Sequence, residues 1–145
     1  GKVMKTDTMR DFAVTIAWKM WGMPYIWGGD DPIDGYDCSG LAIEILKSVN
    51  LLPRKGDWTA DGLYKMFNSK PVTIAKPGCL VLWGNPRKTH IEFVIREGFT
   101  IGASGGGSRT MTREDAIRQN AYVKIRPIAT RSTPSALVDP FEENL

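Results

Sequence analysis

The chain has 145 residues, of which 42% are hydrophobic and 24% charged, an ordinary balance for a globular domain with one sizeable core. Its net charge of +3 is too small to indicate a nucleic-acid-binding surface, and its two cysteines are too few for a disulfide scaffold. No apolar run predicts a membrane span or a signal peptide, but the chain begins at Gly1 rather than Met, so localisation stays open.

The first half of the sequence predicts helices. Residues 7–21 show helical periodicity, and the residues expected to face inward are Met9, Phe12, Ile16 and Met20. A loop rich in Gly, Asp and Pro follows over residues 25–37. We expect a second helix from Cys38 to Val49 and a short third helix from Thr59.

Strand-like alternation replaces helical periodicity in the second half. The expected strands are residues 79–83, 90–95, 99–104 and 122–128. A capping-box pattern at Thr112 predicts a short helix before the last strand. Helices first and strands later favour an α+β fold with an antiparallel sheet. We therefore expect a single domain over residues 1–128, followed by an extended or poorly ordered tail over residues 129–145.

The stretch PYIWGGDDPIDGYDCSG, residues 24–40, places Cys38 after an acid and before Ser-Gly at a predicted helix start. A nucleophilic cysteine must become a thiolate, and the N-terminus of a helix lowers a thiol pKa because its unpaired N–H groups favour negative charge. A neighbouring imidazole completes such activation. The chain has one histidine, His90, so a Cys-His pair can use only that residue.

Structural interpretations fit the same residues. A cysteine at a helix start is often structural, a lone histidine that opens a strand is often a surface residue, and Cys79, in a turn that enters a strand, fits a core position. A metal site is not expected, because two Cys and one His supply only three soft ligands without a close pair. Residue types alone leave a reactive and a structural Cys38 both open.

The stretch YIWGGDDPIDGYDCSGL resembles the nucleophile motif of the NlpC family of papain-like cell-wall peptidases, with Tyr, Gly-Gly, a short polar loop, Asp-Cys-Ser-Gly and an apolar helix. The stretch KPGCLVLWGNPRKTHIEFVI is similar to the family's second block, in which the catalytic His opens a strand. The resemblance covers roughly residues 9–104. It implies a papain-like α+β fold, with the nucleophile at a helix N-terminus and the helices packed on an antiparallel sheet.

The resemblance also implies a cysteine peptidase that hydrolyses peptidoglycan stem peptides, with the bond after γ-D-glutamate as the expected target. Cys38 would be the nucleophile and His90 the general base, while a substrate amine would be bound by Tyr25, Asp37 and Ser39. No cofactor is implied, and the expected partner is peptidoglycan peptide rather than nucleic acid. We expect action at the bacterial cell wall, by a secreted, periplasmic or phage-borne protein that a targeting partner or a separate wall-binding domain brings there.

Two positions depart from the family pattern. The family usually has Asp or Glu where Cys79 stands, and its polar third catalytic residue, on the strand after the His, falls on Gly102. The gap at Gly102 favours a first alternative, a degenerate member that binds cell-wall peptide without cutting it. An amidase or an acyltransferase on the same fold is the second alternative.

Residues 90–104 read as a hairpin, and its register decides what lies opposite Gly102. A two-residue turn at Glu97-Gly98 pairs Phe93 with Gly102. A three-residue turn over residues 96–98 produces the pairs Ile91 with Ala103, Phe93 with Ile101 and Ile95 with Phe99. We choose the three-residue turn because it makes every pair on one face apolar.

With that register, Glu92 lies directly across from Gly102 and on the same face as His90. We predict that the Glu92 carboxylate fills the space left by Gly102 and orients His90, with Ser104 as the second candidate. A Glu92 that is solvated at the cleft edge, with the imidazole held by a backbone carbonyl or water, is the alternative.

Overall fold

A five-stranded antiparallel sheet with the strand order β6-β5-β4-β3-β7 forms the centre of the fold. The computed structural model describes residues 2–31, 35–104 and 107–142. The elements in chain order are α1 (Lys2–Lys19), β1 (Asp30–Asp31), β2 (Gly35–Tyr36), α2 (Cys38–Ser48), α3 (Ala60–Phe67), β3 (Leu80–Trp83), β4 (His90–Arg96), β5 (Phe99–Ser104), η1 (Gly107–Arg109), α4 (Arg113–Gln119), β6 (Tyr122–Pro127), η2 (Ile128–Thr130) and β7 (Ala136–Val138).

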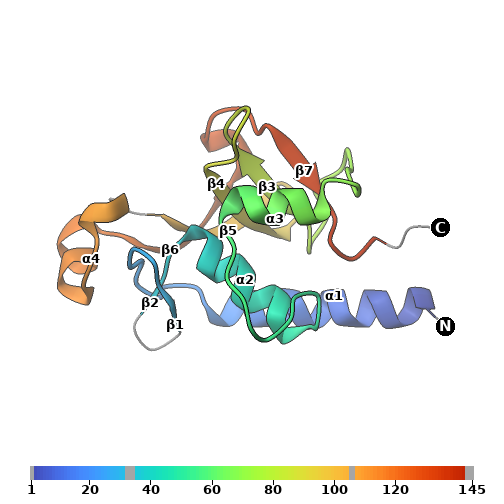
Figure 1. Cartoon of the computed structure of the whole chain (residues 1–145), viewed down its shortest axis with the longest axis horizontal. Helices are drawn as coiled ribbons and strands as arrows, with labels where there is room; N and C mark the ends of the chain where they lie inside the picture. Colours follow the sequence, from blue (N-terminus) through green and yellow to red (C-terminus); the bar gives the residue numbers. More distant parts are fainter. Residues whose placement is uncertain (1, 32–34, 105–106, 143–145) are drawn as a thin grey trace.

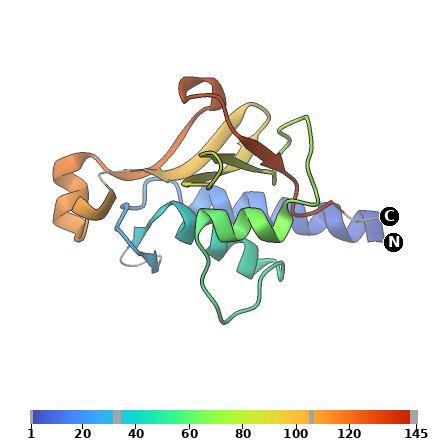
Figure 2. The same cartoon turned by 45° about the horizontal axis from the view of Figure 1, so that its top comes forward.

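Helices α1, α2 and α3 cover one face of this sheet, while α4 lies at one end of the molecule near the short β1–β2 pair (Figures 1 and 2). The main core fills the space between the two layers, and its fully buried members include Leu41, Ile45, Leu63, Leu80, Leu82, Ile91, Phe93 and Ile101. Burial of these apolar side chains is the main favourable term in folding. The predicted α+β class with helices on an antiparallel sheet is confirmed.

Helix α1 follows its predicted apolar spacing except at Phe12: Met20, just after the helix, is buried, and Met9 and Ile16 pack against the core. It begins at Lys2 rather than residue 7, and among the residues whose exposure is described Ala13 and Ala17 are completely buried. Phe12, which we expected to face inward, is 55% exposed. Two alanines allow the helix to approach its neighbours closely, and this packing overrides the larger apolar side chain.

No helix in the described ranges combines the length and apolarity that crossing a membrane requires.

Residues 136–138, which lie in the segment expected to be an extended or poorly ordered tail, form a strand of the sheet. Strand β7 pairs with β3 along the sheet edge. Beyond it, the fully buried Asp139 accepts two hydrogen bonds from Arg10 of α1, at 3.0 and 2.8 Å, and Phe141 is 4% exposed. The chain therefore continues to contribute apolar burial and a buried ion pair well past the predicted domain boundary.

The β4–β5 hairpin combines parts of both registers considered from the sequence. Its turn has two residues, Glu97-Gly98, with Gly98 in the left-handed region at φ +82°, and Arg96 pairs with Phe99. The predicted pair of Ile95 with Phe99 is therefore wrong. A bulge between Val94 and Arg96 absorbs the extra residue and keeps Ile95 in the core. Toward the strand ends the predicted pair of Phe93 with Ile101 is confirmed.

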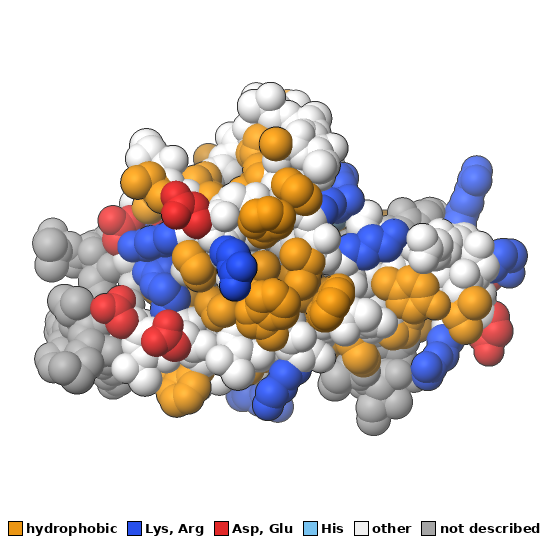
Figure 3. Space-filling model, turned by 180° about the vertical axis from the view of Figure 1, so that it is seen from behind, with side chains coloured by type: hydrophobic (Ala, Val, Ile, Leu, Met, Phe, Trp, Pro, Cys, Tyr) orange, Lys and Arg blue, Asp and Glu red, His pale blue; other side chains and the backbone are white. Residues whose placement is uncertain are grey.

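Apolar side chains gather on the surface opposite the view of Figure 1, where α1 passes the β4–β5 hairpin (Figure 3). Trp18 and Phe99, 43% and 41% exposed, line a shallow hollow of about 120 Å³ together with Ile95, Arg96 and Ile125. This hollow is separate from the residues that the sequence predicts for the functional site.

Candidate active site

Cys38 is the first residue of α2, and the sequence around it builds that helix start. Asp37 is the N-cap, and its carboxylate accepts hydrogen bonds from the backbone N–H groups of Gly40 at 2.7 Å and Gly28 at 3.0 Å. A Cβ at Gly40 would lie 2.2 Å from the carbonyl oxygen of Gly29. The Asp-Cys-Ser-Gly motif thus clamps the Gly-Gly loop against the helix and holds Cys38 at its N-terminus.

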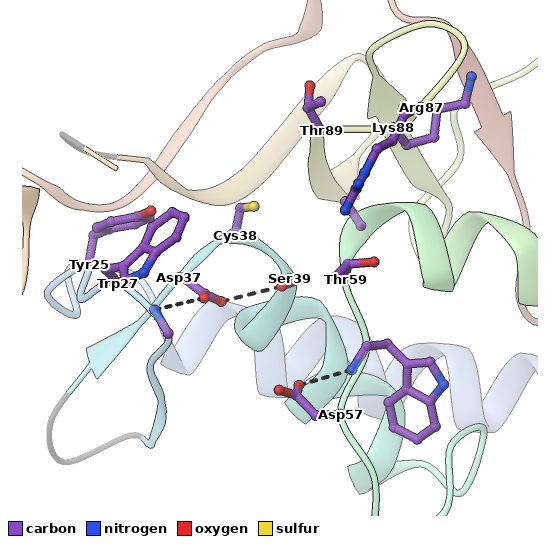
Figure 4. A pocket seen from close by; sticks show the side chains of 13 residues that line it. Tyr25, Trp27, Asp37, Cys38, Ser39, Asp57, Thr59, Arg87, Lys88 and Thr89 are labelled. Carbon is purple, nitrogen blue, oxygen red and sulfur yellow. Dashed lines mark hydrogen bonds between the residues drawn. The ribbon is translucent and has the colours of Figure 1, made fainter. Parts of the chain in front are cut away.

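The thiol lies between two hollows that share Tyr25, Trp27, Cys38 and Thr89 in their walls. The larger one, about 540 Å³, extends over Ser39 and the start of α3 (Figure 4). The smaller one, about 270 Å³, is completed by His90, Ala103, Ser104, Gly107 and Arg131. A bound chain could therefore occupy space on both sides of Cys38. The structure brings Cys38 and His90 to the same hollow, although they are far apart in the sequence.

The Cys38 thiol is not activated in the way expected from its helix position. Burial raises its pKa, the Asp37 carboxylate raises it further, and the backbone N–H groups of Ile91 and Ser39 offset only part of this, which leaves the pKa at about 11. Burial also raises the pKa of Cys79 to about 11. What separates the two thiols is access, because Cys79 is completely buried in a second small core, as predicted, whereas Cys38 lines the cleft.

His90 is held by Glu92 through one ring nitrogen. His90 Nε2 lies 2.6 Å from the Oε2 atom of Glu92. Burial alone would raise the pKa of Glu92, but hydrogen bonds from His90, Arg126 and Thr100 outweigh burial and lower it to about 2. An ionised carboxylate can only accept, so Nε2 carries the proton and donates it. That tautomer leaves Nδ1 as the ring nitrogen able to take a proton from a thiol.

Gly102 provides the space that the Glu92 side chain occupies. A Cβ at residue 102 would lie 2.5 Å from Cγ and 2.7 Å from Cδ of Glu92, closer than real Cβ atoms approach. Glu92 is 2% exposed, and its Oε1 accepts from the Thr100 hydroxyl at 2.6 Å. Arg126, on β6, donates to both carboxylate oxygens. Glu92 is therefore neither solvated nor at the edge of the cleft, and the carboxylate lies where the family pattern lacks a side chain.

Three residues that the sequence did not single out complete the surroundings of His90. The Trp83 ring lies 5.5 Å from the imidazole, measured between centroids, and its Nε1 donates to the Ser132 carbonyl at 2.6 Å. The Arg131 guanidinium lies over the Trp83 ring, 5.3 Å from the ring centroid, and 3.9 Å from Glu92 Oε2. The third is Arg126. Its place opposite Thr100 follows from the β5–β6 register, a pairing that sequence alternation does not predict.

The residues predicted to bind a substrate amine line the larger hollow. Tyr25 is 6% exposed, and burial, followed by the nearby Cys38 and Asp37, raises its pKa to about 12. Burial also raises the pKa of Asp37, against the effect of its two backbone N–H partners. The Ser39 hydroxyl lies 3.5 Å from the same carboxylate. Asp37 thus caps the helix and lines the cleft at once.

Ser104, the second candidate for orienting His90, lines the smaller hollow, and no hydrogen bond joins it to His90 in the described structure. Within residues 2–31, 35–104 and 107–142, no three His, Cys, Asp or Glu side chains gather as metal ligands. Cys38 and the Glu92-bound imidazole of His90 line the same hollow, and this arrangement supports the chemistry of a thiol with an oriented imidazole.

About two thirds of the chain is similar in sequence to known bacterial proteins. It is 37% identical over 96 residues to Protein P54 of Enterococcus faecium, which covers 65% of this chain and 18% of that protein. It is 32% identical over 105 residues to the bifunctional muramidase/DL-endopeptidase CwlT of Bacillus subtilis (strain 168), which covers 67% of this chain and 31% of that protein. The chain thus spans less than a third of the length of these two relatives.

The fold resembles solved structures over most of its length. The NlpC/p60 domain of the peptidoglycan hydrolase SagA matches with a TM-score of 0.65 and 25% identity, covering 90% of this chain and 97% of that chain. This likeness confirms the expected papain-like arrangement. The model of the NlpC/P60 family matches residues 22–127, which include both sequence motifs. The chain therefore belongs to the NlpC/P60 family.

Proposed function

We propose that the protein is a cysteine endopeptidase that hydrolyses peptidoglycan stem peptides at the bond following γ-D-glutamate. The observation that carries the proposal is that Cys38 lines the same hollow as His90, whose Nε2 is held by Glu92 at 2.6 Å. Membership of the NlpC/P60 family supports this chemistry, and the matched relative CwlT is named a DL-endopeptidase.

The reaction begins when His90 Nδ1 takes the proton of the Cys38 thiol as Sγ attacks the scissile carbonyl carbon. The raised pKa of the thiol disfavours a preformed ion pair, so in this scheme His90 acts as a general base while Sγ attacks. The backbone N–H of Cys38, in the first turn of α2, donates to the oxyanion.

The imidazolium then gives its proton to the leaving amine, and the carbon–nitrogen bond breaks to leave a thioester on Cys38. Water, deprotonated by His90, attacks the thioester, releases the carboxylic acid and restores the thiol. Glu92 touches neither substrate nor sulfur in this scheme. It is a positioning residue that fixes the His90 tautomer and stabilises the imidazolium through its negative charge.

Substrate recognition follows from the larger hollow. We propose that Asp37 pairs with a free amine at the start of the substrate peptide and that Tyr25 and Ser39 contact the same group. Acetylation of that amine removes its charge, so the acetylated peptide should be cut far more slowly than the free one. Equal rates on the two peptides would refute this assignment.

A degenerate, non-cutting peptide-binding module is the alternative that the gap at Gly102 favours. Its support weakens because Glu92 occupies the space at that position and contacts His90. An amidase or an acyltransferase on the same scaffold remains a second outcome, because each begins with the same acyl-enzyme.

The test is to incubate the protein with purified peptidoglycan and to analyse the soluble fragments by mass. New amine ends after γ-D-glutamate support the proposal, adducts indicate transfer, and binding without products indicates a module. Cys38→Ala should abolish turnover while Cys79→Ala preserves it. Iodoacetamide at neutral pH should label Cys38, which lines the cleft, before the fully buried Cys79. Preferential labelling of Cys79, or turnover by Cys38→Ala, would overturn the assignment of the nucleophile.

A further inference from the structure

The position of His90 indicates which part of the substrate each of the two hollows beside Cys38 receives. In the proposed reaction, His90 protonates the leaving amine, so the residue after the scissile bond must lie beside the imidazole. His90 lines the smaller hollow and is not part of the wall of the larger one. The smaller hollow therefore receives the leaving residue, and the larger one receives the acyl part. This assignment rests on the proposed function.

The smaller hollow has a cation in its wall and no matching acid. The described residues that line it include Arg131 and His90 but neither Asp nor Glu. The larger hollow differs, because Asp37 and Asp57 line it together with Arg87 and Lys88. The smaller hollow therefore complements a negatively charged leaving residue, whereas the larger hollow has both acidic and basic side chains in its wall.

Arg131 is weakly engaged by the rest of the protein. Its guanidinium lies 3.9 Å from Glu92 Oε2, and it donates no hydrogen bond to any described side chain. Arg126 already donates to both oxygens of that carboxylate. One carboxylate cannot neutralise two guanidinium groups, so the pair of arginines retains a positive charge in excess of Glu92.

Packing nevertheless holds the Arg131 side chain at the hollow. Its guanidinium lies over the Trp83 ring at 5.3 Å from the centroid, and the side chain is 34% exposed. The same indole is anchored by its hydrogen bond to the Ser132 carbonyl. A guanidinium stacked on a fixed ring has lost much of its freedom and keeps its N–H donors for a ligand.

We propose that Arg131 binds a carboxylate on the residue that follows the scissile bond. Guanidinium and carboxylate groups match in geometry and form two parallel hydrogen bonds. An α-carboxylate and a side-chain carboxylate of the leaving residue present the same chemistry, and either one lies a few bonds from the nitrogen that His90 protonates. Arg131 is thus a specificity residue for the leaving side of the substrate.

The test uses four synthetic peptides that begin with L-Ala-γ-D-Glu and differ only in the third residue. One pair ends in Lys with a free or an amidated α-carboxyl group, and the other ends in amidated Glu or amidated Gln. The values of kcat/KM are measured for the unaltered protein, Arg131→Ala, Arg131→Lys and the control Arg54→Ala. Arg54 is exposed and lines neither hollow, and its replacement removes the same charge.

We expect the unaltered protein and Arg54→Ala to prefer the carboxylate in at least one pair by ten-fold or more. The pair that shows the preference identifies the α-carboxylate or the side-chain carboxylate as the ligand. In Arg131→Ala the preference should fall to less than three-fold, and Arg131→Lys should be intermediate because Lys keeps the charge without the planar fork. If Arg131→Ala lowers both rates of a pair equally, Arg131 acts through Glu92 or Trp83, and the proposal is overturned.

A binding measurement separates this proposal from the proposed function. If the unaltered protein cuts none of the peptides, the proposed function fails for these substrates. Calorimetry with Cys38→Ala and with Cys38→Ala combined with Arg131→Ala then measures the affinity of the same peptides. If Cys38→Ala binds the carboxylate peptide of a pair more tightly and the added Arg131→Ala change removes this preference, the inference is supported even though no peptide is cut. Equal affinities within both pairs, or no binding of any peptide, overturn it.

Discussion

Glu92 and Asp139 are both buried carboxylates held by an arginine, but they belong to regions with different tasks. Asp139 is completely buried, accepts two hydrogen bonds from Arg10 and accepts a third from the backbone N–H of Phe141 at 3.0 Å. Glu92 accepts two hydrogen bonds from Arg126 and one from Thr100, but its fourth hydrogen-bond contact is with the catalytic candidate His90. Asp139 ties the C-terminal segment to α1, whereas Glu92 holds His90, a side chain that must exchange protons in the proposed reaction.

The exposure of the cations explains what each pair contributes. The Arg10 side chain is 12% exposed, so removing the Asp139 charge leaves a buried cation without its partner. The side chains of Arg126 and Arg131 are 26% and 34% exposed, so their charges can reach water if Glu92 is neutralised. The comparison therefore predicts that the Asp139 pair matters mainly for stability and that Glu92 matters mainly for turnover.

The largest expected effect is the loss of stability in Asp139→Asn. An uncompensated Arg10 should lower the free energy of unfolding by about 3–5 kcal/mol, as breaking a buried ion pair does. Denaturant titration measures this loss, and the rate per folded molecule should stay close to that of the unaltered protein. Glu142→Gln, an exposed acid nearby, is the control and should change stability by less than about 0.5 kcal/mol. A loss below 1 kcal/mol in Asp139→Asn would break the comparison.

Glu92→Gln should mainly affect catalysis. Loss of the charged hydrogen bond to His90 should lower turnover ten-fold or more, about 1.5–3 kcal/mol in the barrier. The acid limb of the pH–rate profile should move to lower pH, because the anion that stabilises the imidazolium is gone. Glu97→Gln, at the far end of the same hairpin, is the matched control. Unchanged turnover and an unchanged profile would remove Glu92 from the site.

Gly102→Ala tests the same contact from the opposite strand. The added methyl group would meet Cγ of Glu92 at 2.5 Å, and the pinned carboxylate would have to move away from His90. We expect turnover to fall by about five-fold, the equivalent of about 1 kcal/mol for a weakened hydrogen bond. The fall should be much smaller when Gly102→Ala is made in Glu92→Gln, because the two changes remove the same interaction. Strictly additive effects would contradict this account.

The smallest effect concerns pH and stability. The pKa of Glu92 is lowered from 4.5 to about 2, so its contribution to stability is complete above pH 4.5 and is lost as the pH falls toward 2. Between pH 5 and pH 4 this loss should be on the order of 0.5–1 kcal/mol. It is measured as the narrowing difference in unfolding free energy between the unaltered protein and Glu92→Gln. A difference that stays constant from pH 5 to pH 3 would refute the lowered pKa.

Much of the site could be predicted because it depends on local patterns. Asp37 caps α2 and Gly40 admits the Gly-Gly loop within a few residues of Cys38, so the motif specifies its own geometry. The contact of Glu92 with Gly102 follows from strand alternation in one hairpin. The predicted turn was wrong, but the bulge at Ile95 restored the register toward the strand ends.

The sequence by itself thus determined where the thiol and the imidazole stand on their elements and which acid faces Gly102. Only the tertiary structure decided the surroundings that set their chemistry. The high pKa of Cys38 comes from burial, and the arginines that face Glu92 come from β6 and from the segment before β7. Periodicity within an element reports which residues share a face, whereas burial and long-range pairing depend on how distant elements pack, which no local pattern specifies.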